Sequence, residues 1–157
     1  MSRSPATVTI RPAHPQDFEE LWRIDQECFE PGIAYSRFEL AHYMRRRGAF
    51  TLLAEQSPGS VAGFIVAETR AAVGHIITLD VLAKARRMGL GSRLMAEAEE
   101  KLRTAGCSGA YLETAVDNVP AITFYKRQGY SVLKTIPRYY KGRLDALVMG
   151  KRLVSSF

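Results

Sequence analysis

The chain has 157 residues, of which 46% are hydrophobic and 24% are charged, a composition typical of one globular domain. No stretch approaches the roughly 18 unbroken apolar residues of a membrane span, and no apolar segment typical of a secretory signal follows the first residues. The net charge of +6 favours anionic partners such as a phosphate-bearing cofactor, whereas no aromatic-and-basic module indicates direct nucleic-acid binding. We therefore expect one domain over residues 1–157, with a loose tail at 1–6 and neither a membrane nor a nucleic-acid partner.

The cysteine content bears on the cellular compartment. Cys28 and Cys107 lack metal-ligand spacing and do not form the pattern of a disulfide framework. We expect two reduced thiols in a cytoplasmic protein that has no metal site.

The first half of the chain predicts a strand, two helices and three strands. Alternating apolar and polar residues indicate strands, and apolar residues at helical spacing indicate helices. Ser36 and Glu39 form a capping-box pattern ahead of the second helix, and Pro58-Gly59 marks a hairpin turn. In chain order we expect a strand at 7–11, helices at 15–29 and 37–47, and strands at 49–56, 61–69 and 74–81.

The second half predicts a strongly amphipathic helix, a strand, a helix and two more strands. In chain order we expect a helix at 91–105, a strand at 110–115, a helix at 119–128, and strands at 131–136 and 145–153. The crossover helix makes the strands at 74–81 and 110–115 parallel neighbours, while the strands joined by short turns are antiparallel. The chain is therefore expected to form one mixed α/β domain.

A glycine-containing turn at 81–92 joins a strand to the amphipathic helix. Gly89 and Gly91 allow a ligand to approach the backbone closely, and the helix start adds free N–H groups and the positive end of its dipole. Lys84, Arg86 and Arg87 are available to neutralise phosphate. These features predict a pyrophosphate-binding turn.

Two common phosphate-binding motifs do not fit this turn. A P-loop requires Gly-Lys followed by Ser or Thr, but Gly91 is followed by Ser92-Arg93. A dinucleotide fingerprint requires a small residue where Leu94 stands.

The pattern Arg86-x-x-Gly89-x-Gly91, after a strand and before a helix, resembles the acetyl-coenzyme A signature of the GNAT N-acetyltransferases. The resemblance covers roughly residues 9–153 and implies a central, mostly antiparallel seven-stranded sheet with a splayed parallel pair, flanked by about four helices. It implies that acetyl-CoA is the cosubstrate and that its pantetheine arm enters the gap between the splayed strands. The cofactor-binding residues implied by the resemblance are Leu79, Asp80, Val81, Arg86, Arg87, Met88, Gly89, Leu90, Gly91, Ser92, Asn118 and Tyr125.

Residues 111–130 are similar to the RimI-type branch, which acetylates protein N-termini. This similarity implies that Glu113 is the general base, that Tyr125 is the general acid for the thiolate and that Asn118 contacts the pantetheine. Glu113 also interrupts an otherwise apolar strand, which favours a functional role. His75 is the alternative base, because the matching position carries a catalytic tyrosine in some eukaryotic N-terminal acetyltransferases and histidine side chains generally titrate near neutral pH.

The segment Pro137-Arg138-Tyr139-Tyr140-Lys141 resembles a paired-tyrosine loop that closes over the first residues of the substrate in that branch. Leu144-Asp145-Ala146 departs from the Glu-Asp-Ala of the branch, so a peptide contact of that glutamate is not expected. Tyr139 and Tyr35 are the expected substrate-binding residues.

The implied reaction is acetyl transfer from acetyl-CoA to a primary amine, above all the α-amine of a protein or peptide N-terminus, with a ribosomal protein as a possible target. Small-molecule amines and lysine side chains are alternative acceptors. A non-catalytic CoA-binding regulatory module is the alternative from another class.

Overall fold

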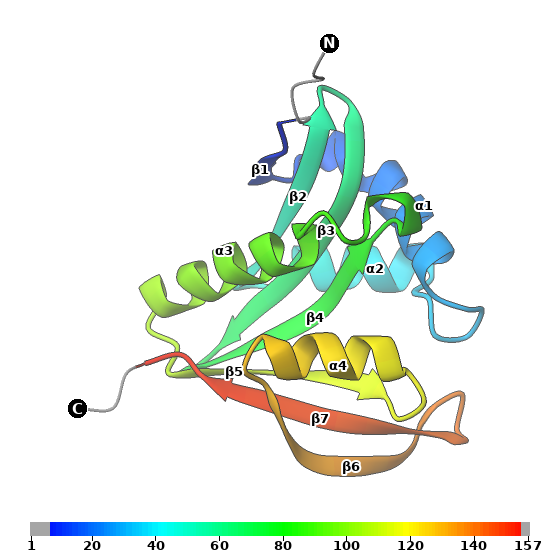
Figure 1. Ribbon diagram of the computed structural model, residues 1–157, viewed down its shortest axis with the longest axis vertical. Helices are drawn as coiled ribbons and strands as arrows, with labels where there is room; N and C mark the ends of the chain where they lie inside the picture. The colour runs from blue at the N-terminus through cyan, green and yellow to red at the C-terminus, as the bar shows by residue number, and fades with distance from the viewer. Residues whose placement is uncertain (1–6, 155–157) are drawn as a thin grey trace.

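The structure, a computed structural model, describes residues 7–154, so the tail expected at 1–6 lies outside the described residues (Figure 1). It contains a seven-stranded sheet with the strand order β1-β2-β3-β4-β5-β7-β6. The strands are β1 (Thr9–Pro12), β2 (Ala49–Ser57), β3 (Ser60–Arg70), β4 (Val73–Val81), β5 (Gly109–Ala115), β6 (Ser131–Tyr140) and β7 (Leu144–Arg152). The helices are α1 (Phe18–Cys28), α2 (Arg37–Arg45), α3 (Leu90–Thr104) and α4 (Val119–Arg127), with short 3-10 turns η1 (Pro15–Asp17) and η2 (Ala83–Ala85).

The predicted fold class is confirmed, including the single parallel pair. β4 and β5 pair in parallel over three positions only, ending at His75 opposite Tyr111, while the other neighbouring strands are antiparallel. Beyond His75 the two strands separate, and Figure 1 shows them diverging toward their carboxyl ends. The separation leaves a gap in the sheet at the carboxyl end of β4.

Helices cover both faces of the sheet. Leu94, Met95 and Leu102 of α3 pack on one face, in a core that also includes partly buried residues of α4. Leu21 and Ile24 of α1, with α2, pack on the opposite face. Both cores are apolar and fully enclosed, so their burial stabilises the sheet around the gap.

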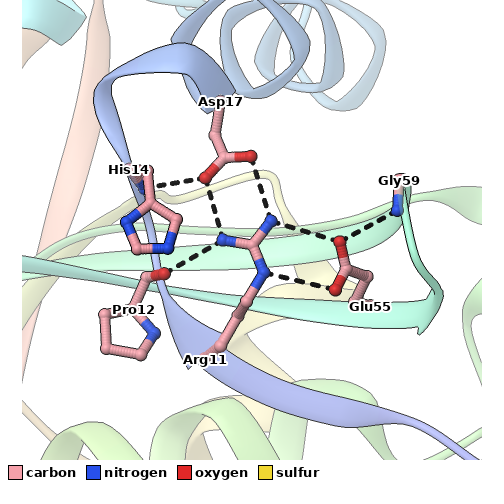
Figure 2. Close-up of polar contacts among 6 residues, drawn as sticks. All are labelled: Arg11, Pro12, His14, Asp17, Glu55 and Gly59. Atoms are coloured by element: carbon pink, nitrogen blue, oxygen red, sulfur yellow. Dashed lines mark hydrogen bonds and ion pairs between the residues drawn. The ribbon is translucent and has the colours of Figure 1, made fainter.

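Arg11 links β1 to the start of α1 through Asp17 and, through Glu55 of β2, to the β2–β3 turn (Figure 2). Its guanidinium donates two hydrogen bonds to Asp17, at 2.9 and 3.0 Å, and two to Glu55, at 3.2 and 3.1 Å. Asp17 also accepts from the His14 amide at 2.7 Å, and Glu55 accepts from the Gly59 amide at 3.1 Å. Hydrogen bonds from Arg11 lower the pKa of both carboxyls.

Most predicted boundaries agree with the structure within two residues, but β6 is longer than expected. Residues 137–140, predicted as a loop, form the end of this strand. A register shift between Ile136 and Tyr140 accommodates them, with Arg138 at a positive φ of 52° and its amide donating to Asp145 Oδ1 at 2.9 Å. The paired tyrosines therefore lie on a bulged strand end, because the bulge keeps the chain paired beyond Pro137.

Within residues 7–154, no helix is long and apolar enough to cross a membrane.

Candidate active site

The turn between β4 and α3 has the geometry of an anion-binding site. Gly89 is the N-cap of α3 at φ +75°, and Arg87 precedes it at φ +73°. In the described part of the chain, no backbone or side-chain group accepts a hydrogen bond from the amides of residues 87–92. A Cβ added at Gly89 would meet nothing within 4 Å, so the space beside the turn is open. The residues present therefore fit a phosphate group at the start of α3.

Basic side chains surround this turn. Arg86 donates from Nε to the Val81 carbonyl at 3.1 Å, which fixes the base of its side chain against β4. Lys84 and Arg87 are exposed beside it. These cations could neutralise a diphosphate held by the free amides.

The backbone of β4 faces the gap at alternate residues. The Val81 carbonyl accepts from Arg86, whereas the Leu82 amide donates to Ala62 of β3 at 2.9 Å. Alternation along the strand then turns Leu79 toward the gap and Asp80 toward β3. Of the three residues expected to line the cofactor, Leu79 and Val81 therefore present backbone to the gap.

The side chain of Asp80 is buried and forms a carboxyl pair with Asp25 of α1. Burial raises the pKa of both carboxyls, and proximity to Asp25 raises that of Asp80 further. Thr78 donates to Asp80 Oδ1 at 2.5 Å, and the Tyr35 amide donates to Asp25 Oδ2 at 2.8 Å. Through the bond from the Tyr35 amide, this pair connects the loop that carries Tyr35 to β4.

The two candidate bases are in direct contact. Nε2 of His75 lies 2.7 Å from Oε2 of Glu113, and both side chains are largely buried, at 14% and 16% exposed. A Cβ on the preceding Gly74 would lie 2.5 Å from Leu102 of α3, so His75 faces the opposite side of the sheet. Glu113 and His75, weighed above as alternatives, form one contacting pair on the face covered by α1 and α2.

Tyr125 approaches the gap from the other face. It packs against the α3 core, with its ring 6.2 Å from Tyr130. Burial, followed by the charge of Asp80, raises the pKa of Tyr125, so its hydroxyl keeps its proton at neutral pH. A phenol that keeps its proton can act as a general acid.

Asn118 is the N-cap of α4 and accepts from the Ala121 amide at 3.3 Å. The cap uses its carbonyl oxygen, so the side-chain NH₂ group remains available to a ligand.

The two expected substrate-binding tyrosines lie on the Glu113 side of the gap. Tyr35 is largely enclosed and donates to the Ile77 carbonyl at 3.4 Å. Burial and the nearby Glu113 raise the pKa of Tyr139. Tyr140 packs 4.8 Å from Tyr139, between ring centroids, and Tyr43 packs 5.3 Å from Tyr35. Phenol rings from α2, β6 and the α1–α2 loop therefore lie on the same side of the sheet as Glu113.

Cys28 and Cys107 are both free thiols. Cys28 Sγ lies 3.5 Å from the Val81 carbonyl, and burial raises the pKa of its thiol to about 11. Within residues 7–154, no group of three or more His, Cys, Asp or Glu side chains is placed to hold a metal ion.

Several residues of the site were not singled out from the sequence. Tyr111 stacks on His75, with centroids 4.4 Å apart and planes within 4°, and its place two residues before Glu113 on one strand was the available signal. Glu68 and Asp25 are buried carboxylates that reach the site only through tertiary packing. No local pattern distinguishes these two from surface acids.

Comparison with known proteins agrees with this geometry. Residues 18–130 match the acetyltransferase (GNAT) family. An N-alpha-acetyltransferase of Sulfurisphaera tokodaii is 27% identical, over 92% of this chain and 92% of its own length.

Solved structures share the fold over almost the whole chain. Ard1 from Thermoplasma volcanium superimposes with a TM-score of 0.86 at 29% identity, covering 94% of this chain and 99% of that one. The ribosomal-protein-S18-alanine N-acetyltransferase of Escherichia coli superimposes with a TM-score of 0.84 at 21% identity, covering 96% and 97%. With the free amides at the start of α3 and the gap between β4 and β5, these matches identify the chain as a member of the GNAT family and an acetyl-CoA-dependent N-acetyltransferase.

Proposed function

We propose that this enzyme transfers the acetyl group of acetyl-CoA to the α-amine of a protein or peptide N-terminus, with residues 1–157 acting as one domain. The contact between His75 and Glu113 at the edge of the gap carries the proposal, because it joins a proton acceptor to a second basic group. The relationship to the N-alpha-acetyltransferase of Sulfurisphaera tokodaii supports the choice of amine. A ribosomal-protein target and a cytoplasmic location stay predictions.

The cofactor side of the site is the face of α3 and α4. The amides of residues 87–92 would hold the pyrophosphate, and the backbone of Leu79 and Val81 would pair with the pantetheine arm. Acetyl-CoA supplies an acetyl thioester, and its carbonyl would lie in the gap. Tyr125 would then donate its proton to the departing thiolate sulfur.

The amine would enter from the opposite face, between the tyrosines. Glu113 would remove one proton from the ammonium group, which frees a nitrogen lone pair for attack on the thioester carbonyl. Tyr35 and Tyr139 would enclose the first residues of the peptide and exclude water from the reacting groups.

The basicity of the acceptor favours an α-amine. Its reference pKa is about 7.7–8.0, against about 10.4 for lysine, so deprotonation at neutral pH costs about 1 kcal/mol rather than about 4–5 kcal/mol. A single carboxylate supported by a histidine suits the smaller of these costs.

A competition experiment tests the acceptor. A peptide with a free N-terminus and one internal lysine is incubated with enzyme and acetyl-CoA, and tandem mass spectrometry locates the acetyl group. We expect it on the N-terminal nitrogen, and no modification of a control peptide whose N-terminus is blocked. Acetylation of the lysine, or of small amines alone, would exclude the N-terminal acceptor.

A further inference from the structure

Glu68 is a buried carboxylate on β3 with no part in the reaction described so far. Its side chain is 2% exposed, and its residue lies in register with His75 on β4. Glu68 Oε1 lies 3.7 Å from Nδ1 of His75. Within residues 7–154, both atoms are buried and make no hydrogen bond by strict geometry. A carboxylate oxygen and an imidazole N–H are complementary, so the two atoms are suited to each other.

The His75 ring therefore lies between two carboxylates. Glu113 contacts Nε2 at 2.7 Å, and Glu68 faces Nδ1 on the far side of the ring. A proton must lie between Nε2 and the Glu113 oxygen at 2.7 Å, and a second N–H on Nδ1 would face Glu68. The arrangement therefore suits the imidazolium that exists after His75 has received a proton. Stacking on Tyr111 fixes the plane of the ring and so keeps both nitrogens in line.

Other charged and titratable groups surround this unit. Arg46, just beyond α2, places Nε 3.2 Å from Glu68 Oε2, and Arg70 of β3 places Nε 3.8 Å from Glu68 Oε1. On the far side, Tyr139 and Tyr140 of β6 lie near Glu113. The arginines hold the Glu68 carboxylate against the sheet and balance part of its charge.

We propose that Glu68 is a positioning residue for acetyl transfer: it orients His75 and stabilises the imidazolium that forms when His75 accepts the amine proton from Glu113. The proton leaves the substrate ammonium, whose N–H electron pair stays on nitrogen for attack on the thioester. It passes through the Glu113 carboxylate to Nε2 of His75, while Nδ1 keeps its hydrogen toward Glu68. Release of that proton to solvent restores the neutral ring with its hydrogen on Nδ1, and the Glu113 carboxylate then separates from Nε2 and can accept the next ammonium proton. This inference rests on the proposed function, because it assigns the route of the amine proton.

The test combines a nuclear magnetic resonance titration of His75 with kinetics of Glu68→Gln. Loss of one carboxylate destabilises the imidazolium, so the ring of His75 should titrate at a lower pH, by on the order of one pH unit. The acidic limb of the kcat–pH profile should move in the same direction. For each pH unit by which the His75 titration shifts, kcat should fall by up to about tenfold, while KM for the peptide changes little. His14 and His42 serve as internal references for the titration.

Glu99→Gln is the matched control, because Glu99 is also a buried glutamate but lies on α3, bonded to Tyr130 and Lys151. This variant should lose stability without moving the His75 titration or the pH profile. If Glu68→Gln does not fold, Glu68→Asp replaces it. The shorter side chain keeps the negative charge but moves it away from the His75 ring, so the His75 titration should still move to lower pH.

A double-mutant cycle separates positioning from general destabilisation. In a His75→Ala background, Glu68→Gln should cause no further loss of kcat. An unchanged His75 titration in Glu68→Gln, or an equal loss of kcat with and without His75, would overturn the inference. Failure of the wild type to acetylate any peptide N-terminus would instead refute the proposed function, and the titration would still report whether Glu68 acts on His75.

Discussion

At the scale of single residues, the candidate acid and base belong to opposite faces of one sheet. Tyr125 comes from the α3 and α4 side, and Glu113 with His75 comes from the α1 and α2 side. An intact sheet would separate them, but β4 and β5 cease to pair after His75. The gap therefore allows one reacting carbonyl to meet an amine on one side and a proton donor on the other.

Tyr125→Phe should lower kcat by about 10²–10⁴-fold, the usual contribution of a general acid. The apparent KM for acetyl-CoA should change little, because the hydroxyl acts only in the transition state. Tyr130→Phe is the control, since its hydroxyl donates to Glu99 at 2.7 Å on the same face but away from the gap. Steady-state kinetics of both variants measure kcat and the apparent KM for acetyl-CoA. Near-normal turnover of Tyr125→Phe would exclude Tyr125 as the general acid.

The residues that could be assigned from the sequence are those whose spacing along the chain is itself the signal. Glu113, Asn118 and Tyr125 lie within one strand-to-helix unit, so their separations are local. Glu68 meets His75 only through the pairing of β3 with β4, whose register shifts beside Val66 and Ala67. No local pattern predicts a shifted register, so this contact required the three-dimensional structure.

At the scale of elements, the start of α3 is the part of the fold most directly committed to a ligand. Gly89 holds the left-handed conformation that begins the helix and leaves the space beside it open. Gly91 has a different constraint, because a Cβ there would approach the Phe124 ring to 3.2 Å. The first glycine thus permits the turn and leaves room for a ligand, and the second allows α4 to pack closely against α3.

Gly89→Leu should weaken acetyl-CoA binding by roughly tenfold or more, the effect of losing one or two charge-assisted hydrogen bonds. Gly59→Leu is the matched control. Gly59 has a φ of +82°, close to the +75° of Gly89, and an added Cβ meets nothing within 4 Å at either glycine, but Gly59 lies in the β2–β3 turn. Both variants should lose similar stability from the strained φ, and only the first should lose affinity by calorimetry. Equal affinities in the two folded variants would contradict phosphate binding at this turn.

Asp17 links the first strand to the first helix, and its contribution should depend on pH. Arg11 lowers the pKa of Asp17, so the ionised carboxylate stabilises the fold above its ordinary pKa of 3.8. This stabilisation is lost as the pH falls through the lower, folded-state value. Asp17→Asn should therefore reduce Tm by a few degrees at neutral pH, with the difference shrinking in acid.

Thermal unfolding at several pH values measures this effect, with Glu97→Gln, on the exposed side of α3, as the control. A difference in Tm that is constant down to acid pH would show that the Asp17 charge is not responsible.

The order and type of the elements were predictable because hydrophobic periodicity is a local property. The end of β6 was not, since Pro137 favours a loop in isolation and no feature of the sequence indicates the positive φ at Arg138. Pairing with β7 and the bond from the Arg138 amide to Asp145 keep this segment in the sheet. Tyr139 and Tyr140 thus lie on an anchored strand end.

At the scale of the whole molecule, the proposed function assigns the cofactor to one face of the sheet and the acceptor to the other. Figure 1 shows α3 and α4 on one face of the sheet and α1 and α2 on the other; Tyr125 packs in the core of the first face, and Tyr35 packs in that of the second. The buried Asp25–Asp80 pair connects the α1–α2 loop, which carries Tyr35, to β4, and β4 borders the gap. Both faces of the proposed site therefore connect to one strand, β4.

The dependence of kcat/KM on pH for Glu113→Gln, with a peptide bearing a free N-terminus, tests the central claim most directly. Loss of the base should lower the rate at neutral pH by about 10²–10⁴-fold while the affinity for acetyl-CoA stays that of the wild type. The rate should recover in part as the pH rises through the α-amine pKa of about 7.7–8.0, because neutral amine then forms without the enzyme. A Glu113→Gln profile that runs parallel to that of the wild type, at nearly the same rate, would contradict the account.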